Sequence, residues 1–255
     1  MTRTKSSRLD NLSGDLSRVT LQKNPTEIGE AFLFNVKIEG MMVIPREAGR
    51  ITYSANIRKM KRMQLDEYQK AVIIGSIFGD AYLEANWSKT NYRMGIRHSV
   101  DQKEYVQWLY EILKPLVLTP PQYYERTRST WFRTISHHEL SEWQKIFYRE
   151  GKKIIPETIA QYLSNPVTIA VWFMDDGNVV TRKGKTSGYH FNTQSFSESE
   201  NRLLAEAMNE VYGIRCTLER NHEYYRLAIY QKESRDNFAV LIREHILPSM
   251  IYKLG

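Results

Sequence analysis

Two aspartates, each at the end of a strongly apolar segment, are the residues of this chain best suited to chemistry. Asp80 ends DEYQKAVIIGSIFGD (66–80), and Asp176 lies at the end of TIAVWFMDDG (168–177). Both segments have the apolar density of a buried helix. Carboxylates brought together at two helix ends would repel each other unless a cation lay between them. Mg²⁺ takes such oxygen ligands, and two ions can assist displacement at a phosphodiester. The alternative is that each aspartate only caps a surface turn.

The sequence that follows the aspartates repeats, which favours a duplicated unit over two unrelated helix ends. When the aspartates are aligned, His98 falls on Gln194, and a segment with capping-box spacing follows each of them. The predicted boxes are Asp101 with Glu104 and Ser197 with Glu200. Each half then reads helix, strand, strand, helix, strand, strand, helix. We therefore predict an α/β (α+β) fold of two pseudo-symmetric αββαββα repeats, over 62–158 and 159–255, whose apolar helices pack together.

The predicted strands carry cations and amides on one face. In TNYRMGIRHS (90–99), apolar residues alternate with basic ones, and TRKGKTSGYHFNTQS (181–195) combines a basic turn with alternating polar residues. Arginine and lysine neutralise phosphates and read guanine, while asparagine and glutamine can read adenine. An ordinary solvated face is the alternative for any single residue. The predicted DNA contacts are Arg93, Arg97, His98, Arg126, Arg128, Arg133, Arg182, Lys183, Lys185, His190, Asn192, Gln194, Arg220 and Arg226.

Composition agrees with a globular protein that binds a polyanion. The chain has 255 residues, 42% of them hydrophobic, and a formal net charge of +7, which favours phosphate-bearing partners. The one cysteine, Cys216, excludes an internal disulfide and a thiolate zinc cluster. The apolar runs are too short to span a bilayer, so no membrane partner is expected. Residues 1–61 are polar and lack a sustained apolar period, so we predict a poorly ordered N-terminal extension.

These residues together resemble the LAGLIDADG homing endonucleases, specifically the single-chain, intron-encoded type with two motifs. The motif copies are IIGSIFGDA (73–81) and IAVWFMDDG (169–177), and Asp80 and Asp176 fall on the metal-binding aspartate. Further matches to that group are LTPP (118–121), NTQSF (192–196) and LPSMIYKL (247–254). The resemblance covers roughly residues 62–255, and the motifs occur in the family's order and spacing.

The resemblance implies two β-sheets that form a saddle over double-stranded DNA. It also implies a monomer that uses two or three Mg²⁺ ions to cut both strands at a long recognition site. The cut would leave 3′ overhangs and promote intron mobility. Family members are typically encoded in organellar or microbial introns, so an organelle is the expected compartment.

The resemblance also assigns further site residues. Lys153 and Lys253 match the family's catalytic lysines, where they would stabilise developing charge, although the two lie differently relative to the prolines that follow or precede them. Gly79 and Asp175 join the metal set through their position beside the motif aspartates. Because Asp175 aligns with a glycine, its side chain is not expected to serve the repeated chemistry. His98 departs from the glutamine or lysine often found at its position.

Three other functions compete with the nuclease. A splicing maturase on the same fold would bind its own intron RNA and cut nothing. A DNA-binding regulator would be an inactive copy of the fold, and the intact motif aspartates argue against it. An unrelated basic α/β protein would not explain the duplicated motif.

Overall fold

The computed structural model describes residues 37–38, 41–42 and 55–255. The chain divides into two compact units, Met1–Ala48 and Gly49–Gly255. In the first unit, β1 (Lys37–Ile38) and β2 (Met41–Met42) pair antiparallel. Most of the extension predicted over 1–61 lies outside the described residues, and its last part forms α1 (Ala55–Arg62) of the second unit.

The second unit confirms the predicted order of elements in both halves. The first repeat comprises α2 (Glu67–Phe78), β3 (Tyr82–Ala85), β4 (Tyr92–Ser99), α3 (Lys103–Leu113), β5 (Gln122–Tyr124), β6 (Ser129–Arg133) and α4 (His138–Phe147). The second comprises α6 (Pro166–Asp176), β9 (Gly177–Arg182), β10 (Lys185–Phe191), α7 (Glu198–Tyr212), β11 (Thr217–Asn221), β12 (Tyr224–Ile229) and α8 (Lys232–Arg243). Shorter elements are η2 (Val100–Gln102), η3 (Lys114–Leu116), η4 (Glu125–Thr127), β7 (Tyr148–Arg149), β8 (Lys152–Lys153), α5 (Ile159–Leu163) and η5 (Pro248–Lys253).

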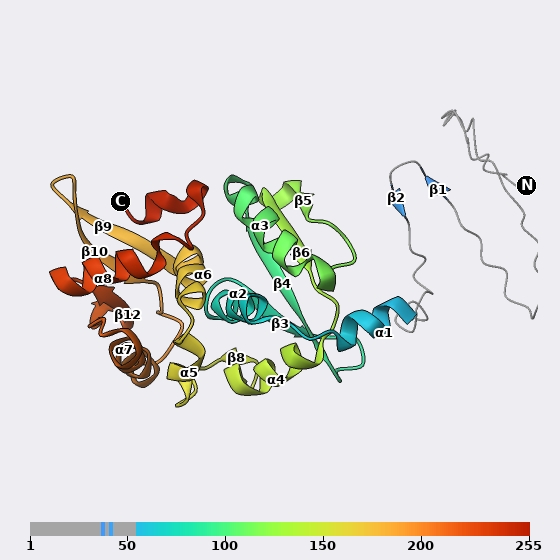
Figure 1. The fold of residues 1–255 in the computed structure, drawn as a ribbon, viewed down its shortest axis with the longest axis horizontal. Helices are drawn as coiled ribbons and strands as arrows, with labels where there is room; N and C mark the ends of the chain where they lie inside the picture. Colours follow the sequence, from blue (N-terminus) through green and yellow to red (C-terminus); the bar gives the residue numbers. More distant parts are fainter. Residues whose placement is uncertain (1–36, 39–40, 43–54) are drawn as a thin grey trace, which may run out of the picture. The chain divides into compact units, whose positions relative to one another are not determined.

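The two sheets are antiparallel and share one topology. Their strand orders are β3-β4-β6-β5 and β9-β10-β12-β11, so corresponding strands of the repeats occupy corresponding places. Figure 1 shows α2 and α6 side by side, with one sheet beyond each helix. The motif helices are therefore the seam between the two repeats.

Helix capping confirms one of the two predicted boxes and corrects the other. Asp66 begins α2 and Ser197 begins α7, each within a capping box. The box predicted from Asp101 and Glu104 is wrong, because the 3₁₀ turn η2 comes before α3. Ser99 caps that turn by accepting a hydrogen bond from the Asp101 backbone, so Asp101 lies inside the turn and caps nothing.

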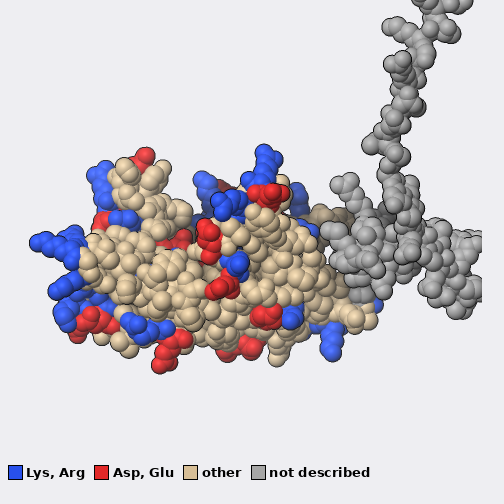
Figure 2. Space-filling model, turned by 90° about the horizontal axis from the view of Figure 1, so that it is seen from above, with Lys and Arg blue, Asp and Glu red and all other residues tan. Residues whose placement is uncertain are grey.

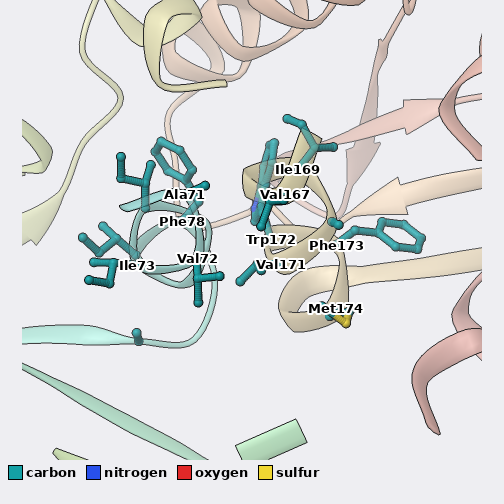
Figure 3. Close-up of a cluster of buried hydrophobic side chains, with 14 of the residues drawn as sticks. Ala71, Val72, Ile73, Phe78, Val167, Ile169, Val171, Trp172, Phe173 and Met174 are labelled. Atoms are coloured by element: carbon teal, nitrogen blue, oxygen red, sulfur yellow. The ribbon is translucent and has the colours of Figure 1, made fainter. Parts of the chain in front are cut away.

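The seam is closely packed because small residues let the helix backbones approach. A Cβ on Gly75 would lie 2.6 Å from the Thr168 carbonyl oxygen and 2.7 Å from the Val171 Cβ. Thr168 also donates its hydroxyl to the Ala71 carbonyl across the seam, at 3.2 Å. Figure 3 shows Val171 facing the opposite helix.

The motif helices also serve as cores for their own repeats. Ile73 of α2 and Phe173 of α6 are fully buried and point away from the seam into the first and second repeat (Figure 3). A helix that is apolar on all sides is stable only when it is surrounded by other elements, and both helices meet that condition. In the part of the chain that the structure describes, no helix is both long and apolar enough to span a bilayer.

Candidate active site

The C-terminal ends of the motif helices meet and bring the predicted carboxylates together. A Cβ on Gly79 would lie 2.3 Å from the Asp175 Cβ, so the absence of a side chain at Gly79 is what lets these ends touch. The backbone N–H of Asp80 donates to Oδ2 of Asp175 at 3.2 Å. Asp176 follows directly, and the negative charge of Asp80 acts on its carboxyl group.

Burial and like charge make this cluster costly without a cation. Burial, followed by the charge of Asp80, raises the pKa of Asp176 to about 7. The same two causes raise the pKa of Asp175, whose side chain is 1% exposed, well above its ordinary value. The Tyr105 hydroxyl is buried beside the Asp175 carboxyl and partly offsets the rise in the pKa of Asp175. Crowded carboxyl groups that raise one another's pKa fit a site for a hard divalent cation.

The raised pKa of Asp176 predicts a pH dependence of stability in metal-free protein. The folded chain holds this proton up to about pH 7, whereas the unfolded chain loses it near pH 4, so stability falls as pH rises between those values. We expect the Tm in chelator to fall across this window and Asp176→Asn to reduce the fall by several degrees. The exposed Asp236→Asn serves as the control. Equal falls in the wild type and Asp176→Asn would contradict the expectation.

The two predicted catalytic lysines contact matching backbone atoms. Nζ of Lys153, on β8, donates to the Gly79 carbonyl at 2.5 Å. Nζ of Lys253, in η5, donates to the Asp175 carbonyl at 3.0 Å and to that of Met174. Because Gly79 and Asp175 are aligned positions, the lysines are equivalent across the seam despite their different spacing from prolines. Each cation also faces the negative end of a helix dipole.

Burial and charge act in opposite directions on these lysines. Burial lowers the pKa of both ammonium groups, and the carboxylates of the cluster raise it. Lys153 and Lys253 in turn lower the pKa of Asp176. The structure therefore brings the four predicted catalytic residues into one electrostatic cluster.

His98 lies among the carboxylates and not with the exposed Arg97 of β4. It is 5% exposed, with Nδ1 3.5 Å from Oδ2 of Asp80 and Nε2 3.7 Å from Oδ1 of Asp175. Burial lowers its pKa. The alternation of the strand predicts the burial of His98, because this residue shares the face of the buried Met94 and Ile96.

Two groups of side chains in the described part of the chain have the spacing to hold a metal ion. Asp80, His98 and Asp175 form one of them. The other includes His137, whose Nε2 lies 2.9 Å from the Met63 carbonyl and whose Nδ1 accepts from the backbone of α4. Both ring nitrogens of His137 are thus already engaged, Nδ1 with the start of α4 and Nε2 with the Met63 carbonyl.

Most of the predicted DNA contacts are exposed at strands and turns. Arg97 and Arg133 lie on β4 and β6, and the others of this kind lie at the β5–β6 and β9–β10 turns and on β11. The exposed cations are Arg97, Arg126, Arg128, Arg133, Arg182, Lys183, Lys185 and Arg220. Figure 2 shows Lys and Arg side chains standing out on both repeats, with carboxylates interspersed among them.

Two of the predicted arginines are already paired with glutamates across their sheets. Arg93 contacts Glu84 at 2.7 Å, and Arg226 contacts Glu219 in the second sheet. Both are opposite-charge pairs in direct register on neighbouring strands. These arginines are half-buried and are presented in fixed positions.

The remaining predicted contacts lie on β10 and just after it. His190 is buried and its Nε2 lies 2.7 Å from the Tyr230 hydroxyl. Asn192 and Gln194 follow the end of β10, so the predicted alternation stops at Phe191. Asn192 is exposed, and its backbone N–H donates to the Asp176 carbonyl at 2.9 Å, which places it beside the carboxylate cluster.

Two αββαββα repeats joined by aspartate-bearing helices in one chain define the single-chain, two-motif class of LAGLIDADG proteins. Residues 70–237 match the model of the LAGLIDADG DNA endonuclease family, and the chain belongs to this family.

Its relatives include both endonucleases and maturases. The chain is 28% identical over 200 residues to "Probable intron-encoded endonuclease 1" of Wickerhamomyces canadensis, covering 74% of this chain and 85% of the relative. It is also 28% identical over 204 residues to "Cytochrome b mRNA maturase bI2" of Debaryomyces hansenii, covering 75% of each. The structure of the homing endonuclease I-WcaI bound to its DNA recognition sequence matches with a TM-score of 0.71 at 24% identity, over 79% of this chain and 93% of that one. This last match establishes the fold.

Proposed function

We propose that the chain is a site-specific, Mg²⁺-dependent homing endonuclease that cuts both strands of a long DNA site and leaves 3′ overhangs. The observation that carries the proposal is the intact pair of motif aspartates with a lysine at each helix end. RNA binding alone gives no reason to keep crowded, mutually repelling carboxylates. Both half-sites lie in one chain, so a monomer would suffice.

The cation would be held by oxygen atoms of four residues. The carboxylates of Asp80 and Asp176 lie at the C-terminal end of the seam, together with the carbonyls of Gly79 and Asp175, which also accept from Lys153 and Lys253. When bound, Mg²⁺ supplies Lewis-acid stabilisation and an activated water for attack on a phosphodiester. Asp176 binds it in the ionised form, which the positive charges of Lys153 and Lys253 favour.

The lysines would act on the DNA itself. Each ammonium group is fixed at the end of a motif helix by a backbone carbonyl, and so stands close to where a scissile phosphate would meet the carboxylates. A fixed positive charge at that place stabilises charge that develops on the phosphate oxygens. The exposed arginines and lysines on the strands and turns, which include Arg97 and Arg220, would hold the duplex across both sheets.

A maturase function is the second candidate, because a named maturase is as similar to this chain as a named endonuclease. The discriminating experiment incubates the protein and Mg²⁺ with a duplex spanning the intron insertion site of an intronless allele. We expect a double-strand cut with 3′ overhangs. Intact DNA, together with faster splicing of the intron RNA in a parallel reaction, would favour the maturase. Origin in an organellar intron remains a prediction from the resemblance.

A further inference from the structure

We propose that Asp175 is a positioning residue that reaches across the seam and holds Asp80 in place, partly through His98. The proposal rests on the proposed function, in which Asp80 is a metal ligand. Alignment of the two motifs gives the Asp175 side chain no role, because Gly79 occupies the equivalent position in the first repeat. The proposal assigns it one.

Asp175 holds the backbone of Asp80 directly. Its Oδ2 accepts a hydrogen bond from the Asp80 N–H at 3.2 Å. Its side chain fills the space beside Gly79, where an added Cβ would lie 2.3 Å from the Cβ of Asp175. The first motif helix ends at Phe78, so Asp80 lies beyond the helix and needs another anchor. A carboxylate of the second repeat supplies that anchor.

His98 extends the support to the Asp80 side chain. Its two ring nitrogens face the two carboxylates, Nδ1 toward Asp80 at 3.5 Å and Nε2 toward Asp175 at 3.7 Å. The ring is buried and packs edge-on against Tyr105, with centroids 5.0 Å apart. A buried group that orients a metal ligand is a recurring feature of metal sites, and its loss costs metal affinity without removing the ligand itself.

Each motif aspartate with its neighbours forms one half of the site. The half around Asp176 lacks the contacts that hold Asp80, so the two halves are chemically unequal. The positions aligned with Asp175 and His98 are Gly79 and Gln194. Neither a carboxylate nor an imidazole is therefore available at these positions to hold Asp176. The first half-site therefore depends on a residue from the second repeat. The absence of a side chain at Gly79 leaves room for the side chain of Asp175 between the helix ends.

The test compares Asp175→Ala and Asp175→Asn with wild type on a strand-labelled target duplex. Asp175→Ala removes the acceptor for the Asp80 N–H, whereas Asp175→Asn keeps an acceptor oxygen. We expect Asp175→Ala to weaken Mn²⁺ binding by the protein–DNA complex about tenfold, measured as free Mn²⁺ by electron paramagnetic resonance. DNA affinity should change less than about twofold, and Asp175→Asn should fall between Asp175→Ala and wild type.

Strand-resolved nicking supplies a readout that a purely structural role would not move. Both cuts should slow in Asp175→Ala, but unequally, because only one half-site loses its support. Should Asp175→Ala fail to fold, His98→Gln, which places the second repeat's residue type in the first, should give the same unequal loss. Wild-type Mn²⁺ affinity with equal strand rates in the folded variant would overturn the proposal. Failure of the wild type to cut DNA would instead count against the proposed function.

Discussion

Replacing Asp176 with Asn is expected to reduce DNA cleavage by about a thousandfold and to leave DNA binding within about twofold. The change keeps the shape of the side chain and removes the charge that would hold the cation. Loss of several kcal/mol of transition-state stabilisation corresponds to a rate loss of this size. Asp80→Asn should have the same effect, because the two carboxylates act on one cluster.

Cleavage of labelled duplex and a gel-shift titration would measure these two quantities on the same preparations. The exposed Asp236→Asn, on α8, is the matched control and should cut at the wild-type rate. Near-normal cleavage by either motif variant would remove the aspartates from the mechanism. Loss of DNA binding in parallel with cleavage would show that the substitutions act through folding.

Gly75→Ala is expected to lower the free energy of unfolding by about 2–3 kcal/mol, because the seam has no room for a side chain at this position. The added Cβ would stand 2.6 Å from a backbone carbonyl of the other motif helix, and a backbone atom has no rotamer by which to move away. The two helices would have to move apart. Because each helix is also part of the core of its own repeat, this movement would disturb the packing of both repeats.

Ser76→Ala is the matched control for this change, one residue along the same helix. Its hydroxyl is buried without a hydrogen-bond partner, so its removal should be neutral or slightly stabilising. Urea unfolding of both variants and the wild type would compare them. Gly75→Ala and Ser76→Ala with the same stability would contradict the close seam described for α2 and α6.

The repeated architecture could be predicted from sequence because each level of the chain gives the same answer. Apolar helices, alternating strands and capping residues recur in one order after Asp80 and after Asp176. The error at Asp101 has a local cause, since a capping box and a 3₁₀ turn begin with similar polar residues. Only the backbone that follows Ser99 distinguishes them.

The cluster around the aspartates was less predictable, because it depends on contacts between the repeats. The equivalence of Lys153 and Lys253 is invisible in their spacing and follows from the carbonyls they contact. The contact of Asp175 with Asp80 crosses the seam, and an alignment of the two motifs shows only a glycine opposite it. The burial of His98 could be predicted from sequence, because strand alternation places it on the apolar face of its strand.

The most direct measurement is the anomalous diffraction of Mn²⁺ in crystals of the chain bound to its target duplex. The proposed function predicts Mn²⁺ peaks at coordination distance, about 2.0–2.3 Å, from the carboxylate oxygens of Asp80 and Asp176 and beside a scissile phosphate. DNA lying across both sheets with no Mn²⁺ between these two carboxylates, or with Mn²⁺ bound only near His137, would contradict it.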